Sequence, residues 1–472
     1  MSDVSSTKKA PPAVLQQPAA QPAKKKFFAS KQEKISSLLF LGVSVAYVKF
    51  VLFGLSYPFA EWSMVLFLFV FFAVVEISAR LCKVAFSKES AFWAVAMLAI
   101  AVGTTMQNNE WVLGAYGWIL LHLTAAQFAL TRLGGAAESK AGSLIPFDFV
   151  RAWFILPFSN FLRNIQVLCY GIKLPRKFSR SKEWLWVAMG LLLALPLLLW
   201  SFSTLVQADK IFEHTMGRWG YWLSQWSPLE MLSQWFDFYS LVLYGFFWCW
   251  FYGLFYGAFH SKENTNRLKT QEIYSFLEKI RQFPGKVFAI PVVLLAALYL
   301  LFFVSQLQYF TGGFLGVLPQ KYTVAEYARQ GFFELLRIAS VNLGVLVVCQ
   351  KLARNGMENS RVLRWFAMVL MACNLLFVAI ASSKLGLYIS CFGLTPKRVL
   401  AAYAIVVVAL WSVLAMVRLL RPFRVAEVAI HLAALLFCLL CWLPWNQWIQ
   451  ENPRHSTVES TEIYYGQIDP NF

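Results

Sequence analysis

Residues 327–348 read YARQGFFELLRIASVNLGVLVV, and this stretch decides the fold of the chain. From Phe332 to Val348 the sequence is apolar enough and long enough for a helix that crosses a bilayer. Glu334 and Arg337 stand three residues apart near its start, so they can meet on one helix face. Ionisable groups inside a bilayer are costly unless they are paired or hydrated. The stretch therefore predicts a membrane helix with a polar site near one end.

The composition of the whole chain agrees with a membrane protein. Of its 472 residues 59% are hydrophobic and 14% are charged, whereas soluble domains have about 45–50% and about 25%. We therefore predict an all-α, polytopic integral membrane protein. Apolar runs of about 17–25 residues predict about eleven transmembrane helices, at 36–57, 62–79, 90–106, 111–130, 184–206, 238–259, 287–307, 331–349, 365–388, 399–417 and 425–445.

Basic residues are distributed unevenly between the two sides of these helices. Of the 42 Lys and Arg residues, 32 fall in segments on one side and only 7 on the other. The positive-inside rule then predicts a cytoplasmic N-terminus and an external C-terminus. The same asymmetry explains the net charge of +18 without nucleic acid. We expect no nucleic-acid partner, and we expect anionic lipid at the basic cytoplasmic loops.

The segments between and beyond the spans suggest a division of the chain. Residues 131–183 carry many aromatic residues with Arg151 and Arg163 among them, which indicates a helix in the headgroup region or one packed on the cytoplasmic ends of the spans. The full division is a disordered basic cytoplasmic tail (1–35), a four-helix N-terminal membrane part (36–130), a cytoplasmic interfacial amphipathic segment (131–183), a seven-helix membrane core (184–445) with a Trp-rich external segment (207–237), and an external polar tail (446–472).

One packing motif is present, but no motif for a cofactor or for catalysis. Gly253 and Gly257 are four residues apart within one span, a spacing that predicts close packing by another helix. The sequence has no His-Glu-x-x-His zinc motif, no Walker-type phosphate loop and no nucleophile elbow. We therefore predict no cofactor and no metal, and the sequence identifies no catalytic residue.

Three phrases resemble a known family. Residues 326–335 resemble the Tyr-Ala-Arg-x-Gly-Phe signature of bacterial multi-pass membrane proteins of the domain of unknown function 4153/4173 family. Residues 208–212 and 393–398 are similar to its Ala-Asp-x-x-Phe and Gly-Leu-Thr-x-x-Arg phrases. The resemblance covers roughly residues 180–445. It implies a multi-pass protein of the bacterial inner membrane and leaves its activity open.

These phrases fall at the outer ends of three predicted spans, which suggests one external polar site. The site would receive an anionic group, or its charges would only hold helices together. Lys49 could be a further member of this site. We expect non-enzymatic binding, transport or signalling there; the alternative is a membrane enzyme that acts on lipid-linked envelope substrates. The candidate residues are Asp209, Tyr327, Arg329, Glu334, Arg337, Lys384 and Arg398.

Overall fold

The computed structural model describes residues 28–54, 60–108, 115–138, 140–170, 218, 238–264, 275, 285–305, 332–352 and 361–451. Within these residues every regular element is a helix. The predicted span 184–206 and almost all of segment 207–237 lie outside them, as do the tail 1–27 and the end of the chain after residue 451.

Helices occupy the other ten predicted spans. They are α1 (Lys31–Ala46) with its π-helical continuation η1 (Tyr47–Leu52), α2 (Ser63–Leu81), α3 (Lys88–Met106), α4 (Ala115–Leu133), α11 (Phe238–Asn264), α13 (Gly285–Ser305), α16 (Phe332–Leu352), α17 (Arg361–Phe392), α18 (Pro396–Leu420) and α19 (Val425–Trp442). Seven described helices are long and apolar enough to cross a membrane. The chain is thus a multi-pass membrane protein, and the total of eleven spans and their orientation stay predictions.

Shorter elements lie between and after these helices. They are η2 (Ala60–Trp62), α5 (Ile145–Val150), the π-helical turn η4 (Arg151–Ile155), α6 (Leu156–Ser159), α7 (Arg163–Leu168) and α20 (Trp445–Glu451). The elements from α5 to α7 follow each other almost without interruption, and they prove to be central to the candidate site.

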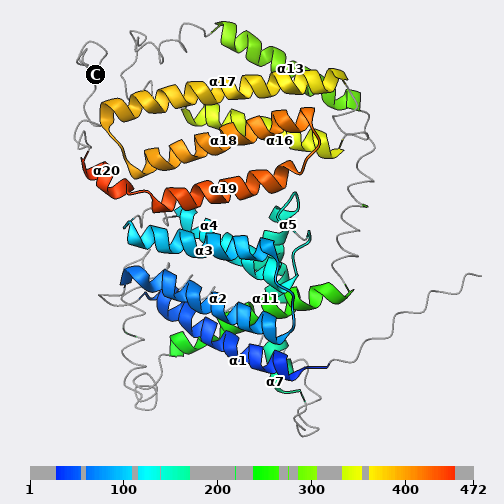
Figure 1. Ribbon diagram of the computed structural model, residues 1–472, viewed down its shortest axis with the longest axis vertical. Coiled ribbons are helices and arrows are strands. Elements are labelled where there is room, and N and C mark those ends of the chain that lie inside the picture. Colours follow the sequence, from blue (N-terminus) through cyan, green and yellow to red (C-terminus); the bar gives the residue numbers. More distant parts are fainter. Residues whose placement is uncertain are drawn as a thin grey trace, which may run out of the picture.

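The long helices lie side by side across the molecule and form two hydrophobic cores (Figure 1). The first core joins α1, α2, α3, α4 and α11 with the short elements α5 to α7. The second joins α13, α16, α17 and α18. Helix α19 packs against both α3 and α18, so it connects the two cores.

A chain of hydrogen bonds between buried side chains runs through the second core, with one residue from each of its four helices. Tyr299 on α13 donates its hydroxyl to Asn342 on α16 (2.9 Å). Asn342 donates its amide to Asn374 on α17 (3.0 Å), and Asn374 donates to Ser412 on α18 (2.8 Å). Ser412 donates to the carbonyl of Val408 (2.7 Å). Because that carbonyl can only accept, it sets the direction of the whole chain.

Buried carboxylates join helices at the end of the bundle that the charge count predicts to be cytoplasmic. Glu33, in the first turn of α1, lies 2.6 Å from Nε2 of His260 on α11. Two further contacts of this kind are Glu76 on α2 with Arg132 on α4 (2.5 Å) and Glu89 on α3 with His431 on α19 (3.2 Å). Each contact gives a buried or half-buried carboxylate a partner on a second helix.

Candidate functional site

Four of the seven predicted site residues lie within the described part of the chain. Asp209, Tyr327 and Arg329 lie outside it. The other four are Glu334 and Arg337 on α16, Lys384 on α17 and Arg398 on α18. Glu334 and Arg398 are in the first turns of their helices, and Lys384 is near the end of its helix, so these three residues lie toward the same end of the bundle.

The structure describes Lys384 and Glu334 at the same end of the bundle, where the side chain of Lys384 is buried and that of Glu334 is exposed. Glu334 and Arg337 are both exposed, and no ion pair joins these two described side chains. Lys49 is exposed on η1, across the molecule from α16 (Figure 1), so it does not join them.

Arg398 has a structural role that the sequence did not indicate. Its guanidinium is buried and donates to the carbonyls of Phe392 (2.8 Å) and Gly393 (2.6 Å), which are at the end of α17. The guanidinium carbon lies 4.1 Å from the ring centroid of Tyr388. Gly393 has φ of 76°, the left-handed conformation that glycine adopts readily after a helix. The phrase Gly393 to Arg398 therefore builds the turn between α17 and α18.

Replacement of Arg398 tests this role, and replacement of its charged neighbour Lys397 is the control. In Arg398→Gln the two carbonyls lose their cationic donor, so we expect unfolding to become easier by about 1–3 kcal/mol. Lys397→Gln removes an exposed charge in the same turn and should change stability little. Thermal unfolding of both variants in detergent measures the difference. Equal midpoints for the two variants would show that Arg398 does not hold the turn.

The most developed candidate site lies in the first core, where residues 140–170 pack along α11. This segment starts at the predicted cytoplasmic end, where Arg151 pairs with Asp148 (3.1 Å) and donates to the carbonyl of Gly135 (3.1 Å) and the hydroxyl of Ser261 (3.3 Å). Burial raises the pKa of Asp148 to about 6, so its carboxylate is still charged at neutral pH and can pair with Arg151.

From this end the segment runs along α11 toward the start of that helix and then turns back to the first turn of α1. Trp250 donates its indole N–H to the carbonyl of Trp153 (3.2 Å), and the rings of Phe161 and Phe246 lie 5.6 Å apart. The contacts on α11 thus run from Ser261 to Phe246, or about 22 Å of helix. On the way back Lys34, in the first turn of α1, donates to the carbonyl of Tyr170 (2.6 Å). The segment thus packs along more than half of α11, and its position relative to the membrane stays a prediction.

Two glycines of α11 let the segment approach this closely. A Cβ atom on Gly253 would lie 2.5 Å from the carbonyl oxygen of Pro157, and one on Gly257 would lie 2.7 Å from Nδ2 of Asn160. Alanine at either position would collide with its neighbour. The partner at these glycines is the short helix α6 and the residue that follows it, rather than a second long helix.

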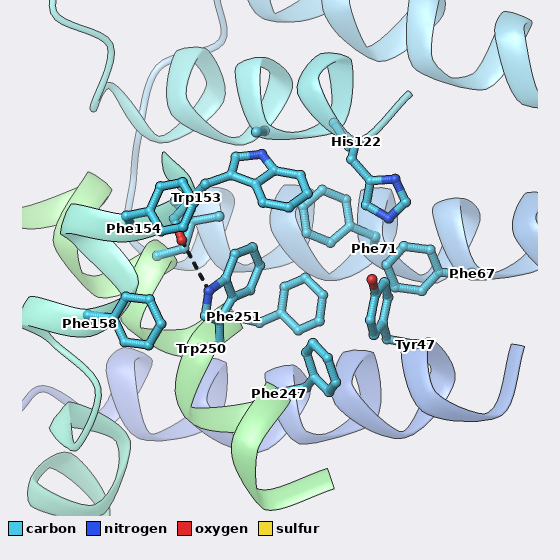
Figure 2. Close-up of a pocket in the computed structure, with 13 residues that line it drawn as sticks. Tyr47, Phe67, Phe71, His122, Trp153, Phe154, Phe158, Phe247, Trp250 and Phe251 are labelled. Carbon is cyan, nitrogen blue, oxygen red and sulfur yellow. Dashed lines mark hydrogen bonds between the residues drawn. The ribbon is translucent and has the colours of Figure 1, made fainter. Parts of the chain in front are cut away.

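Where the segment meets α11 it closes an aromatic cavity of about 300 Å³ (Figure 2). The walls come from η1, α2, α4, η4 with α6, and α11. Nine of the thirteen lining residues are Phe, Trp or Tyr. The complete set is Tyr47, Phe67, Phe71, His122, Ala125, Ala126, Trp153, Phe154, Phe158, Phe247, Trp250, Phe251 and Leu254.

Both π-helical turns of the described chain contribute side chains to this cavity. Tyr47 is the first residue of η1, and Trp153 and Phe154 belong to η4. A π-helical turn holds more residues than an α-helical turn and changes the direction in which the following side chains point, and such turns are frequent at functional sites. Their presence on two opposite walls is an independent indication that this region is a binding site.

His122 contributes a buried polar atom to the cavity wall. Its Nδ1 lies 2.8 Å from the carbonyl oxygen of Trp118; since a carbonyl only accepts, Nδ1 bears the hydrogen. A charged imidazolium without a partner would be costly in these apolar surroundings, so the ring is neutral and Nε2 is an acceptor. This Nε2 is buried and has no hydrogen-bond partner among the described residues. Figure 2 shows the Nε2 edge turned toward Tyr47.

Sequence reasoning did not find this cavity. Its residues come from segments that are far apart in the chain, and aromatic residues are so frequent here that no single one stands out. One signal was present, because the aromatic residues between Phe147 and Phe161 exceed what a surface helix needs. His122 is a histidine within a predicted span, but its missing partner cannot be read from sequence.

A multi-pass helical membrane protein with an aromatic cavity between its helices is thus the class that the fold and site define. The family model described as Domain of unknown function (DUF4153) matches residues 91–467, so the chain belongs to this family. The match begins well before residue 180, where the resemblance was expected to start, and it includes α3, α4 and the segment α5 to α7. Comparisons with curated proteins and with solved structures find no match.

Proposed function

We propose that this protein binds a lipid-soluble molecule of the bilayer in the aromatic cavity and acts in transport or signalling rather than in catalysis. The observation that carries the proposal is the cavity itself, which residues 140–170 close against α11, a helix apolar enough to cross the membrane. Ligand pockets in proteins have volumes of about 300–1,000 Å³ and mostly apolar walls with a few polar groups. This cavity is at the lower end of that range.

The exposed aromatic residues beside the cavity support entry from the lipid. Phe154 and Phe158 line the cavity and are still 58% and 40% exposed. Because they contact the middle of a membrane helix, their exposed faces would meet acyl chains rather than water. A ligand dissolved in the bilayer can then enter between them without passing through the aqueous phase.

The chemistry of the walls favours binding over catalysis. Among the thirteen lining residues His122 and Tyr47 are the only groups that could transfer a proton, and the set contains no carboxylate, thiol or amine. Chemistry at this site would need a nucleophile or an acid–base pair that the walls do not supply.

Filling the cavity tests the proposal. Ala125 is a buried cavity residue on α4, so Ala125→Phe should occupy the space that the ligand needs. Ala73→Phe is the matched control, because Ala73 is exposed on α2 and does not line the cavity. The measurement is mass spectrometry of organic extracts from wild-type and variant proteins purified in mild detergent.

We expect at least one lipophilic molecule to co-purify with the wild type and with Ala73→Phe. Its amount in the extract should be at least tenfold lower for Ala125→Phe. Thermal unfolding of the same samples establishes that all three are folded. Identical extracts from three folded proteins would contradict the proposal.

The outer polar site is a second candidate, favoured by the burial of Lys384 at the end of the bundle where Glu334 lies in the first turn of α16. It could bind an anionic group, and Glu334 could act as a base if the protein is instead an enzyme on lipid-linked envelope substrates. Both roles need water at this depth. Ile338, one turn after Glu334, is half-buried on α16.

Labelling of Ile338→Cys, in a cysteine-free background, with a membrane-impermeant maleimide from outside measures that access. We expect rapid labelling if a water-filled cavity reaches the charged pair. A control cysteine at exposed Asn108 should react in either case. Reaction at position 108 without reaction at position 338 would show that Glu334 and Lys384 are dry packing groups.

A further inference from the structure

The polar atoms at one end of the cavity restrict the kind of molecule that can fill it. His122 and Tyr47 lie together there, with ring centroids 6.1 Å apart and planes at 87°. Figure 2 shows the Tyr47 hydroxyl pointing toward the His122 ring. No hydrogen bond joins these two described side chains, so a polar atom of a ligand that comes between them can bond to both.

Hydrogen-bonding capacity decides which polar atom fits between them. The neutral His122 ring offers only an acceptor at Nε2, while the Tyr47 hydroxyl can donate. A group that donates to Nε2 and accepts from Tyr47 satisfies both at once. A hydroxyl group does this with a single oxygen atom. A ketone, an ether or a pure hydrocarbon would leave Nε2 buried without a partner, which costs about 1–3 kcal/mol.

Trp153 is the other residue of the wall with a buried polar atom that lacks a hydrogen-bond partner among the described residues, but this atom faces away from His122 and Tyr47. Its indole nitrogen also has no hydrogen-bond partner in the described part of the chain. In Figure 2 this nitrogen is on the side of its ring away from Tyr47 and Phe251, so it does not face the space beside His122. His122 and Tyr47 are therefore the pair that meets the polar end of a ligand.

We infer that the ligand is a lipid-soluble alcohol or phenol whose hydroxyl group lies between His122 and Tyr47 and donates to Nε2 of His122. Its apolar body lies among the aromatic rings, and any longer chain extends into the bilayer past Phe154 and Phe158. This inference rests on the proposed function, because it names the ligand class of the same cavity.

A pair of probes with the same body tests the inference in the intact protein. 4-(Trifluoromethyl)phenol carries the hydroxyl donor, and 4-(trifluoromethyl)anisole replaces its hydrogen with a methyl group. Fluorine NMR titration of the purified protein in nanodiscs, with empty nanodiscs as the reference for partitioning, measures the affinity for each probe. We expect the phenol to bind about tenfold more tightly, because only the phenol satisfies Nε2.

Two variants then identify the residue responsible. His122→Phe keeps the bulk of the ring but removes the acceptor, so the phenol should lose its advantage. Tyr47→Phe removes the neighbouring hydroxyl and should weaken both probes while the phenol keeps its advantage. A preference that survives in folded His122→Phe, or that disappears in folded Tyr47→Phe, would overturn the assignment to His122.

The affinities of the wild-type protein for the two probes test the hydroxyl assignment even if His122→Phe does not fold. Equal affinity for the two probes would overturn the hydroxyl assignment and leave the cavity as a site for other apolar molecules. The absence of binding by both probes, together with extracts unchanged by Ala125→Phe, would instead reject the cavity as a ligand site.

Discussion

The bilayer contains no water to satisfy a polar group, so every polar group that enters it must have a partner in the protein. The second core follows this constraint closely, since Tyr299, Asn342, Asn374 and Ser412 pass a hydrogen bond from helix to helix until it ends on a backbone carbonyl. The guanidinium of Arg398 donates to two carbonyls and lies against the ring of Tyr388. In both places the polar side chains stabilise the packing of the helices.

The first core departs from this pattern at several places, and one of them is the aromatic cavity. There a segment of short helices packs along α11, and irregular backbone at membrane depth has to be covered by protein. The close approach of Pro157 to Gly253 and the hydrogen bond from Trp250 to Trp153 supply that cover. The same arrangement leaves a cavity and leaves Nε2 of His122 without a partner. A buried acceptor that the fold does not satisfy is best explained by a ligand that does.

The sequence predicted the helices well and their partners poorly. Long apolar runs are sufficient to locate a membrane helix, and helices are present at every predicted span that the structure describes. Which helices pack together depends on side chains distant in sequence, as where Glu33 meets His260 or Glu89 meets His431. Arg398 was grouped with the polar site because position along a helix gives no direction to a side chain. Asn342 and Asn374 were overlooked, although an isolated asparagine in an apolar helix is itself a packing signal.

The depth of residues 140–170 in the membrane is the claim on which the ligand account depends. A nitroxide label at Phe154, in a cysteine-free protein in liposomes, reports depth through its collision rates with oxygen and with a water-soluble nickel chelate. The matched site is Lys140, whose side chain is 52% exposed at the start of the same segment. The account predicts that the label at position 154 collides with oxygen and hardly with nickel, whereas the label at position 140 meets nickel readily. Equal access of nickel to both sites would place the segment at the membrane surface and contradict the account.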